Sequence, residues 1–346
     1  MAEAGVTASL RSLVLASGLS NDPGATPMRL TLSPLALALA ALMLGACTPA
    51  SQDAPADTAA TDAATPAATD TAAADAAAKA EADLRNAAAD PMDAILAGDW
   101  RDPANVARDA YRHPRETLAF FGVGPSQTVV EISPGGGWYT EILAPLAQGK
   151  GRYIGALNDP AKAGSERATE YYTKANQGFR DKLAARPDVY ANASVVEVDP
   201  AAPVFGEPGS ADVVLTFRNV HNWVGAGSEA AMFKGFFDVL APGGVLGVVE
   251  HRAAPGKTLE EVKESGYLPE DYVIGLATAA GFVLEEKSEV NANPADTKDH
   301  PNGVWTLPPS NRHDEADKAK YAAIGESDRM TLRFVKPQPA AETAAQ

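Results

Sequence analysis

Short apolar runs alternate with longer amphipathic segments over the second two thirds of the chain. Five runs rich in β-branched residues each predict a buried central strand of a parallel sheet, over residues 128–132, 151–157, 193–198, 211–217 and 245–250. Two further strands are predicted over residues 282–290 and 330–336, joined by a long loop into an antiparallel, hairpin-like ending. The pattern therefore predicts seven strands.

Amphipathic segments between these runs predict helices. One helix is expected to begin at Asp102-Pro103 and another at His113-Pro114, because proline is favoured at the first position of a helix. Further helices are predicted over residues 138–146, 160–186, 228–240 and 269–280. This order of elements is typical of an α/β fold with a mostly parallel sheet, here of seven strands with an antiparallel last strand.

A different pattern precedes the folded part. Leu35–Leu44 is an uncharged apolar run, too short for a membrane-spanning helix and typical of the core of a secretion signal, with a buried helix as the alternative. It leads into Leu44-Gly45-Ala46-Cys47, which resembles the lipobox of bacterial lipoprotein signals. That resemblance implies a signal over residues 28–46, with residues 1–27 as an upstream extension.

The same resemblance implies cleavage before Cys47 and acylation of that cysteine, which would tether the protein to a membrane in the periplasm. Thr48 in the next position mildly favours the outer membrane. Residues 48–90 are rich in Ala, Asp, Thr and Pro and bury too little apolar surface to fold. The predicted organisation is a signal with its extension over 1–46, lipidated cysteine and disordered tether over 47–90, a folded domain over 91–337 and a disordered tail over 338–346.

Composition narrows the choice of partner. The chain has 29 Lys and Arg against 45 Asp and Glu, a formal net charge of −16, which argues against binding to the nucleic-acid backbone. Its single cysteine excludes an internal disulfide framework and a cysteine-based zinc site. The five histidines are dispersed without the spacing of paired ligands, so no metal site is predicted. A small molecule is the expected partner.

The most informative segment is the turn that follows the first predicted strand. Glu131 lies near the end of that strand, and Gly135-Gly136-Gly137 opens the next helix. Glycines there let backbone N–H groups approach a ligand, at the edge of the sheet where α/β proteins bind ligands. A plain connection between strand and helix is the alternative. A dinucleotide fingerprint would need another glycine where the chain has Thr140, which disfavours a dehydrogenase.

The segment from Glu131 to Gly137 resembles motif I of the class I S-adenosylmethionine-dependent methyltransferases, E/D-x-x-x-G-x-G. The resemblance extends over about residues 105–336. It includes Leu240–Gly244, which matches the family's turn before the fifth strand and also fits a simple helix end. It implies a Rossmann-like, doubly wound sheet and S-adenosylmethionine as the cofactor.

The resemblance also implies the cofactor-binding residues. The methionine end of the cofactor would be held by Glu131 and the backbone of the turn, namely Ser133, Gly135, Gly136 and Gly137. Asn158 or Asp159 would replace the acid that usually binds the ribose hydroxyls, and Asp199 matches the acid that reads the adenine amine. Asn219, after the fourth strand, is assigned to the same site.

Polar and aromatic residues are densest after the fourth predicted strand, over Thr216–Trp223. His221 is the candidate general base for a hydroxyl or acidic carbon acceptor, or it holds the loop by hydrogen bonding. Arg218 is the candidate to orient an anionic substrate, or it pairs with a neighbouring acid. The Asn/Asp-Pro-Pro-Tyr motif of many amino-group methyltransferases is absent, which disfavours N-methylation.

Other segments are expected at the same edge of the sheet. His251 and Arg252 follow the fifth strand, and Trp138 and Tyr139 either contact the cofactor or belong to the core. Residues 295–312 form a long polar segment that is either a lid over a pocket or a disordered loop.

The leading hypothesis is a methyltransferase acting on a small molecule and tethered outside the cytoplasm. The alternatives are a non-catalytic ligand-binding lipoprotein that keeps the fold and, less favoured, a nucleotide-dependent oxidoreductase.

Overall fold

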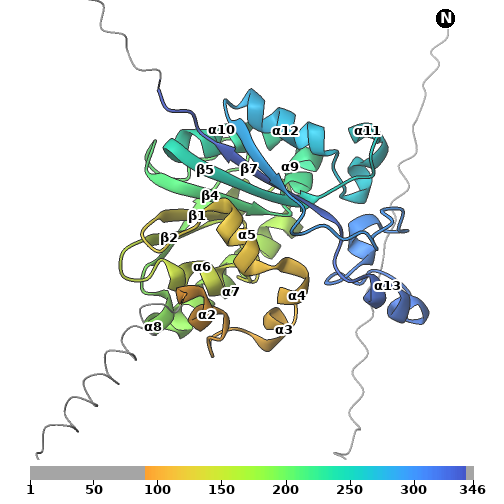
Figure 1. Cartoon of the computed structure of the whole chain (residues 1–346), viewed down its shortest axis with the longest axis horizontal. Helices are drawn as coiled ribbons and strands as arrows, with labels where there is room; N and C mark the ends of the chain where they lie inside the picture. The colour runs from red at the N-terminus through yellow and green to blue at the C-terminus, as the bar shows by residue number, and fades with distance from the viewer. Residues whose placement is uncertain (1–89, 340–346) are drawn as a thin grey trace, which may run out of the picture. The chain divides into compact units, whose positions relative to one another are not determined.

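The computed structural model describes residues 90–339 (Figure 1). The predicted signal, Cys47 and all of the predicted tether except Asp90 lie outside the described residues, as do residues 340–346. Asp90 caps the first described helix, α2 (Pro91–Leu96), by accepting a hydrogen bond from the backbone N–H of Met92 at 3.0 Å. None of the described helices is both long and apolar enough to cross a membrane.

A seven-stranded sheet runs through the described residues, in the order β3-β2-β1-β4-β5-β7-β6. Its strands are β1 (Thr128–Ile132), β2 (Arg152–Asn158), β3 (Ala193–Val198), β4 (Ala211–Phe217), β5 (Leu240–His251), β6 (Val283–Ser288) and β7 (Arg329–Val335). The first five strands pair in parallel, and β7 is antiparallel to both β5 and β6. The predicted doubly wound, mostly parallel seven-stranded α/β sheet with an antiparallel last strand is confirmed.

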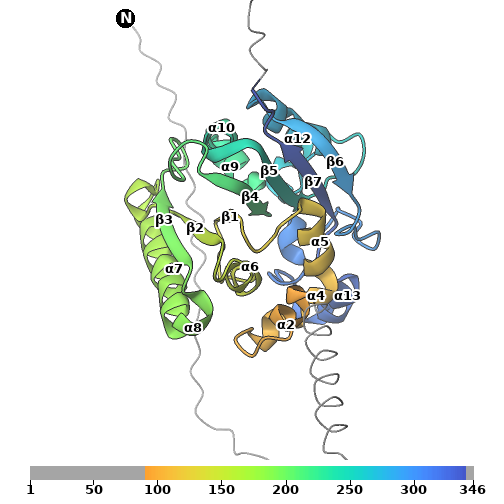
Figure 2. The same ribbon diagram turned by 60° about the vertical axis from the view of Figure 1, so that its left-hand side comes forward.

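Helices cover both faces of the sheet (Figure 2). One face packs against α2, α5 (Pro114–Phe121), α6 (Thr140–Leu146), α7 (Glu166–Ala185) and α8 (Pro187–Tyr190). The other face packs against α9 (Val220–Ala226), α10 (Glu229–Val239) and α12 (Glu270–Ala279). The remaining helices are α3 (Pro103–Val106), α4 (Asp109–Arg112), α11 (Leu259–Val262), α13 (Lys318–Ile324) and the short 3₁₀ turns η1 (Pro160–Lys162), η2 (Lys263–Ser265), η3 (Gly303–Thr306) and η4 (Glu315–Asp317).

The alternation of side chains along the strands builds a core on each face. On β4, Val214 packs into one core, whereas Val213 and Leu215 pack into the other. Successive residues of a strand point to opposite faces, so a strand covered on both sides is apolar throughout. This requirement explains why the central strands could be recognised as continuous apolar runs.

The predicted helix starts are also found. Asp102 caps α3, where its carboxylate accepts a hydrogen bond from the N–H of Ala104 at 2.8 Å, and Pro103 occupies the first helical position. His113 precedes Pro114 at the start of α5 with a φ of 41°. Both prolines lie where a missing N–H costs no helical hydrogen bond.

Several predicted elements differ from the structure. The helix expected over residues 160–186 is divided into η1 and α7, because Asp159 and Ser165 each cap a separate start. The helix expected from residue 138 begins at Thr140. Helix α9, over residues 220–226, was not predicted from the sequence.

Two strands also depart from the prediction. β3 was expected to be a buried central strand, but it forms an edge of the sheet and is mostly half-buried or exposed, since it pairs only with β2 (Figure 2). The turn expected at Leu240–Gly244 lies inside β5. Ala211 pairs with Leu240 and Val213 with Val245, so the residues between Leu240 and Val245 form a β-bulge, with Gly243 at a φ of 80°.

Gly247 allows the close packing of β5 against α5. A Cβ added at Gly247 would lie 2.7 Å from Cδ2 of Leu215 and 2.8 Å from Cγ of Phe121. We therefore expect Gly247→Ala to lower the free energy of unfolding by about 1–3 kcal/mol. The control is Gly275→Ala in α12, where an added Cβ meets nothing within 4 Å and alanine is the better helix former. Equal stabilities of the two variants in urea would contradict this packing.

Candidate functional site

A cavity of about 430 Å³ opens where β1, β4 and β5 end. Its walls come from the glycine turn after β1, from the residues that follow β4, from His251 at the end of β5, from the α3–α4 region and from residues 304–310. The cavity is lined by Arg108, Arg112, Glu131, Ser133, Gly135, Gly136, Trp138, Tyr139, Phe217, Arg218, Asn219, His221, His251 and Trp305, among others. The structure thus gathers most of the predicted site residues at one edge of the sheet.

The turn after β1 has an unusual backbone. Ser133, Gly135 and Gly137 have φ values of 48°, 59° and 81°, in the left-handed region that glycine adopts readily and serine does not. A Cβ added at Gly135 or Gly136 would meet nothing within 4 Å, so both positions border open space. The turn therefore exposes main chain to a ligand.

A second cavity of about 460 Å³ adjoins the first. It lies against the ends of β2 and β3 and against α7 and α9, and its lining includes Asn158, Tyr172, Asn176, Pro200 and Trp223. Both cavities are lined by Ser133, Gly135, Tyr171, Asn219 and Asn222. The glycine turn is thus a shared wall between two spaces of similar size.

Glu131 is a buried carboxyl beneath this turn. Its Oε2 accepts hydrogen bonds from the hydroxyls of Tyr153 at 2.6 Å and Thr140 at 2.9 Å. Burial raises the pKa of Glu131 to about 7, although these two hydrogen bonds and the charge of Lys182 act to lower it. The lone pairs of Oε1 have no hydrogen-bond donor among the described residues. Glu131 can therefore gain or lose a proton near neutral pH.

The other predicted cofactor residues fall into two groups. Asn158 lines the second cavity, and Asn219 lines both cavities while its Nδ2 donates to the carbonyl of Ile132 at 2.9 Å. Asp159 and Asp199 line neither cavity. Their carboxylates accept hydrogen bonds within their own loops, from the N–H groups of Ala161 at 2.8 Å and Ala201 at 2.9 Å.

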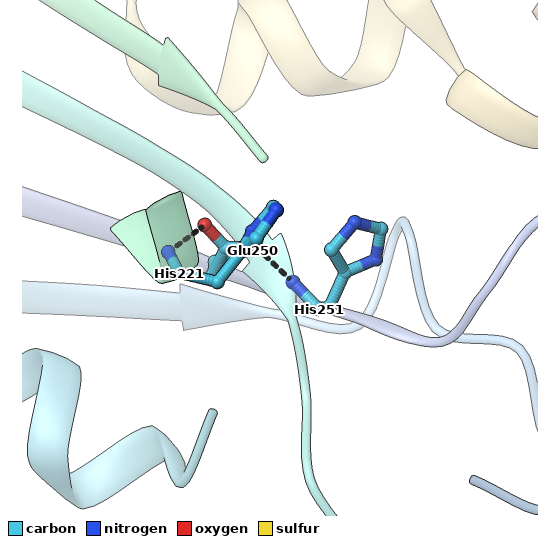
Figure 3. Close-up of side chains that lie close together, drawn as sticks. All are labelled: His221, Glu250 and His251. Atoms are coloured by element: carbon cyan, nitrogen blue, oxygen red, sulfur yellow. Dashed lines mark hydrogen bonds and ion pairs between the residues drawn. The ribbon is translucent and has the colours of Figure 1, made fainter. Parts of the chain in front are cut away.

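His221 is held by a carboxylate that the sequence analysis did not select. Glu250, fully buried at the end of β5, lies between the backbones of His221 and His251 (Figure 3). Its Oε1 lies 3.0 Å from Nδ1 of His221 and accepts from the N–H of His251 at 2.8 Å. Its Oε2 accepts from the N–H of Val220 at 2.6 Å. Glu250 is the one charged residue in the apolar run Val245–Glu250, and that was its signal in the sequence.

This arrangement suits His221 as a base. A carboxylate beside Nδ1 favours the tautomer that carries its proton there, which leaves the lone pair on Nε2. Nε2 has no hydrogen-bond partner among the described residues, and His221 lines the first cavity. Burial and the neighbouring His221 and Arg218 lower the pKa of His251 well below its usual value, so His251 is neutral.

The structure also brings together residues that could ligate a metal. Side-chain atoms of His221, Glu250 and His251 lie within 4.8 Å of one another, although the histidines are far apart in the sequence. The two oxygens of Glu250 already accept hydrogen bonds from Val220 N, His221 N, His221 Nδ1 and His251 N. Because these lone pairs are already used, Glu250 is better suited to position His221 than to ligate a metal.

Arg218 follows β4 with a φ of 62°, a strained conformation for a residue with a side chain. Its side chain lines the first cavity. Arg252, by contrast, is turned away from the cavity and binds Glu289 and Asp328. Tyr139 stacks on Phe217 with ring centroids 3.5 Å apart, and both line the first cavity beside the buried Trp138.

Residues 295–312 form an ordered wall of the first cavity. Val304, Trp305 and Pro308–Ser310 line it, while Thr306 and Leu307 are buried beneath. The buried Asp296 anchors the segment by accepting hydrogen bonds from the Tyr267 hydroxyl and the N–H of Asp328. The alternative of a disordered loop is wrong, because Val304 and Trp305 of this segment pack against Ala253 and Tyr267.

Comparisons with known proteins return structural likenesses alone. No protein-family model and no curated protein matches the chain. Three similar solved structures are a SAM-dependent methyltransferase from Aquifex aeolicus, the glycopeptide N-methyltransferase MtfA and the [4+2]-cyclase SpnF. Their identities to this chain are 15%, 16% and 14%, and their TM-scores are 0.42, 0.44 and 0.42. The matches cover 72%, 68% and 66% of this chain and 100%, 100% and 82% of the respective structures.

The raised pKa of Glu131 predicts a pH-dependent effect on stability. Between pH 4.5 and about 7 the native carboxyl keeps a proton that the unfolded chain loses, so this group destabilises the fold as the pH rises through that window. Glu131→Gln removes the titration while its amide oxygen can still accept both hydrogen bonds. The stability of Glu131→Gln relative to the wild type should rise by up to about 3 kcal/mol between pH 4.5 and about 8.

Urea unfolding of both proteins across this pH range measures the difference. Glu207→Gln, at an exposed position, controls for the loss of one negative charge. A difference between Glu131→Gln and the wild type that stays constant with pH would contradict a buried, neutral Glu131.

Proposed function

We propose that this protein is an S-adenosylmethionine-dependent methyltransferase that acts on a small-molecule acceptor. The observation that carries the proposal is the pair of adjoining cavities that share Ser133 and Gly135 of the glycine turn. A two-substrate transfer needs two binding spaces that meet at the reacting atoms. The cofactor is assigned to the second cavity and the turn, and the acceptor to the first.

The residues around the turn suit the cofactor. The N–H groups of Gly135 and Gly136 and Oε1 of Glu131 would bind the methionine end, whose ammonium group favours an ionised Glu131. The N–H groups of Ser133 and Gly137 already donate to the carbonyls of Ala156 at 2.8 Å and Pro134 at 3.0 Å, and Gly137 lines neither cavity. Asn158 and Asn219 offer amide groups in the second cavity, which has no carboxylate in its lining. The ribose would therefore bind amides rather than the usual acid. When bound, the cofactor supplies a methyl group on a positively charged sulfur.

His221 and Glu250 supply the base. Nε2 of His221 would take the proton of an acceptor hydroxyl, and the buried Glu250 would stabilise the resulting imidazolium through Nδ1. Arg218 orients the acceptor, while Tyr139, Phe217 and Trp305 form apolar walls of its cavity.

The location of the protein is part of the proposal. The apolar run before Cys47 supports a lipid anchor on that cysteine and a place in the periplasm, and Thr48 mildly favours the outer membrane. S-Adenosylmethionine is made in the cytoplasm. Binding without turnover would therefore favour the alternative, a tethered ligand-binding protein that keeps the methyltransferase fold.

Gly136→Val tests the cofactor site. Gly136 is outside the left-handed region and its added Cβ would face open space, so valine should leave the fold intact. Its methyl groups would occupy the space beside the turn, on the side of the first cavity, where the methionine end of the cofactor is assigned. By titration calorimetry we expect the wild type to bind S-adenosylmethionine and Gly136→Val to bind it at least about tenfold more weakly. Gly164→Val, at an exposed position away from both cavities, is the matched control. No binding by the wild type, or equal binding by both variants, would contradict the assignment.

His221→Ala tests the base. We expect turnover of a hydroxyl acceptor to fall by about 100-fold or more, with unchanged affinity for S-adenosylhomocysteine, because the imidazole acts on the acceptor. Added imidazole should restore part of the rate. Formation of S-adenosylhomocysteine is the readout, and an undiminished rate would remove His221 from the mechanism.

A further inference from the structure

Four arginines surround one buried carboxylate beside the first cavity. Nε of Arg108 lies 2.8 Å from Oε1 of Glu326, Nε of Arg112 lies 3.1 Å from Oε2, and Nη1 of Arg329 lies 3.0 Å from Oε2. Arg218 adds a fourth guanidinium whose field acts on the same carboxylate. The cluster therefore carries more positive than negative charge in a region that excludes most water.

The neighbouring arginines and the burial act on the pKa of Glu326 in opposite directions. Burial alone would raise the pKa of Glu326, yet the four arginines lower it to about 2. Burial and the neighbouring Arg218 lower the pKa of Arg112. One carboxylate thus fails to balance the guanidinium charges around it.

Two guanidinium nitrogens lack a hydrogen-bond partner among the described residues, although the Arg112 guanidinium also lies over the Trp138 ring, with Cζ 4.8 Å from the ring centroid. Nη2 of Arg112 and Nη2 of Arg108 are buried, and neither has a hydrogen-bond partner among the described residues. Arg112 is 3% exposed, and both arginines line the first cavity. A buried donor without an acceptor costs about 1–3 kcal/mol, more when it is charged. The protein bears this cost at the wall of a cavity, where a ligand can supply the acceptor.

The rest of the cavity does not supply that acceptor. Glu131 is the one acidic residue in its lining, its pKa is raised to about 7, and its Oε2 is already bound to Tyr153 and Thr140. Arg218 lines the same cavity as Arg108 and Arg112. Arg108, Arg112 and Arg218 therefore line a cavity whose lining contains no fully ionised carboxylate to pair with them.

We infer that the acceptor binds through an oxyanion, a carboxylate or a phosphate, held by Arg108, Arg112 and Arg218. Guanidinium groups bind such oxyanions through paired, charge-assisted hydrogen bonds. This inference rests on the proposed function, which identifies the bound anion as the methyl acceptor. It narrows the substrate class to small acids that also carry a hydroxyl within reach of His221, and the aromatic walls favour a planar acid.

Competition distinguishes the acceptor's oxyanion from the carboxylate of the cofactor. Benzoate and inorganic phosphate are titrated into the full-length protein by calorimetry, with and without saturating S-adenosylhomocysteine, and benzamide is the uncharged match for benzoate. We expect benzoate or phosphate to bind in both conditions and benzamide not to bind. Displacement of both anions by S-adenosylhomocysteine would assign the arginines to the cofactor and overturn the inference.

Arg218→Met tests the residues. Arg218 is half-buried and is not part of the ion pairs to Glu326, so its loss should not unfold the protein. We expect at least about tenfold weaker anion binding and unchanged affinity for S-adenosylhomocysteine. Arg167→Met, at an exposed position of α7, is the control for the loss of one positive charge.

The two proposals fail separately. Binding of S-adenosylhomocysteine without binding of either anion would overturn the inference and leave the proposed function standing. Anion binding without S-adenosylhomocysteine binding would overturn the proposed function and, with it, the identity of the anion as an acceptor. Equal anion affinities of Arg218→Met and Arg167→Met would remove Arg218 from the anion site.

Discussion

The site depends on two strained backbone positions at the ends of neighbouring strands. β1 and β4 pair in register, with Ile132 opposite Thr216, and shortly beyond this pair Ser133 and Arg218 adopt φ values of 48° and 62°. Each such conformation costs about 1–3 kcal/mol and persists only where surrounding structure enforces it. Ser133 begins the glycine turn, which lies between the two cavities. Arg218 lines the first cavity.

Buried carboxylates organise the groups around this opening. Glu250 ties the start of α9 to the end of β5 and orients His221, while Glu326 holds Arg108 and Arg112 at the wall of the same cavity. Removing either carboxylate would leave several buried donors without acceptors. The loss of stability would then exceed the net stabilisation that each hydrogen bond provides, because an unpaired buried donor also bears its full cost of desolvation. Neither carboxylate lines the first cavity, yet they hold the imidazole of His221 and the guanidinium groups of Arg108 and Arg112 at its wall.

The fold could be predicted from the sequence because its central strands are buried on both faces and appear as continuous apolar runs. The glycine turn, His221 and Arg218 were recognisable because they follow such runs directly. The pair of Glu326 and Arg112 was not recognisable, since 214 residues separate the two in the chain and each charged residue, taken alone, resembles a solvated one. The bulge in β5 and the edge position of β3 depend on strand pairing, which local sequence does not encode.

In the proposed function, one shared turn separates a cofactor space from an acidic-acceptor space. A crystal structure of the full-length protein with S-adenosylhomocysteine and benzoate tests this arrangement. We expect the adenosine beside Asn158 and Asn219, the sulfur at Gly135-Gly136 and the benzoate carboxylate on Arg218 and Arg112. S-Adenosylhomocysteine lying wholly in the cavity of Arg112 and His221, with its own carboxylate on the arginines, would contradict it.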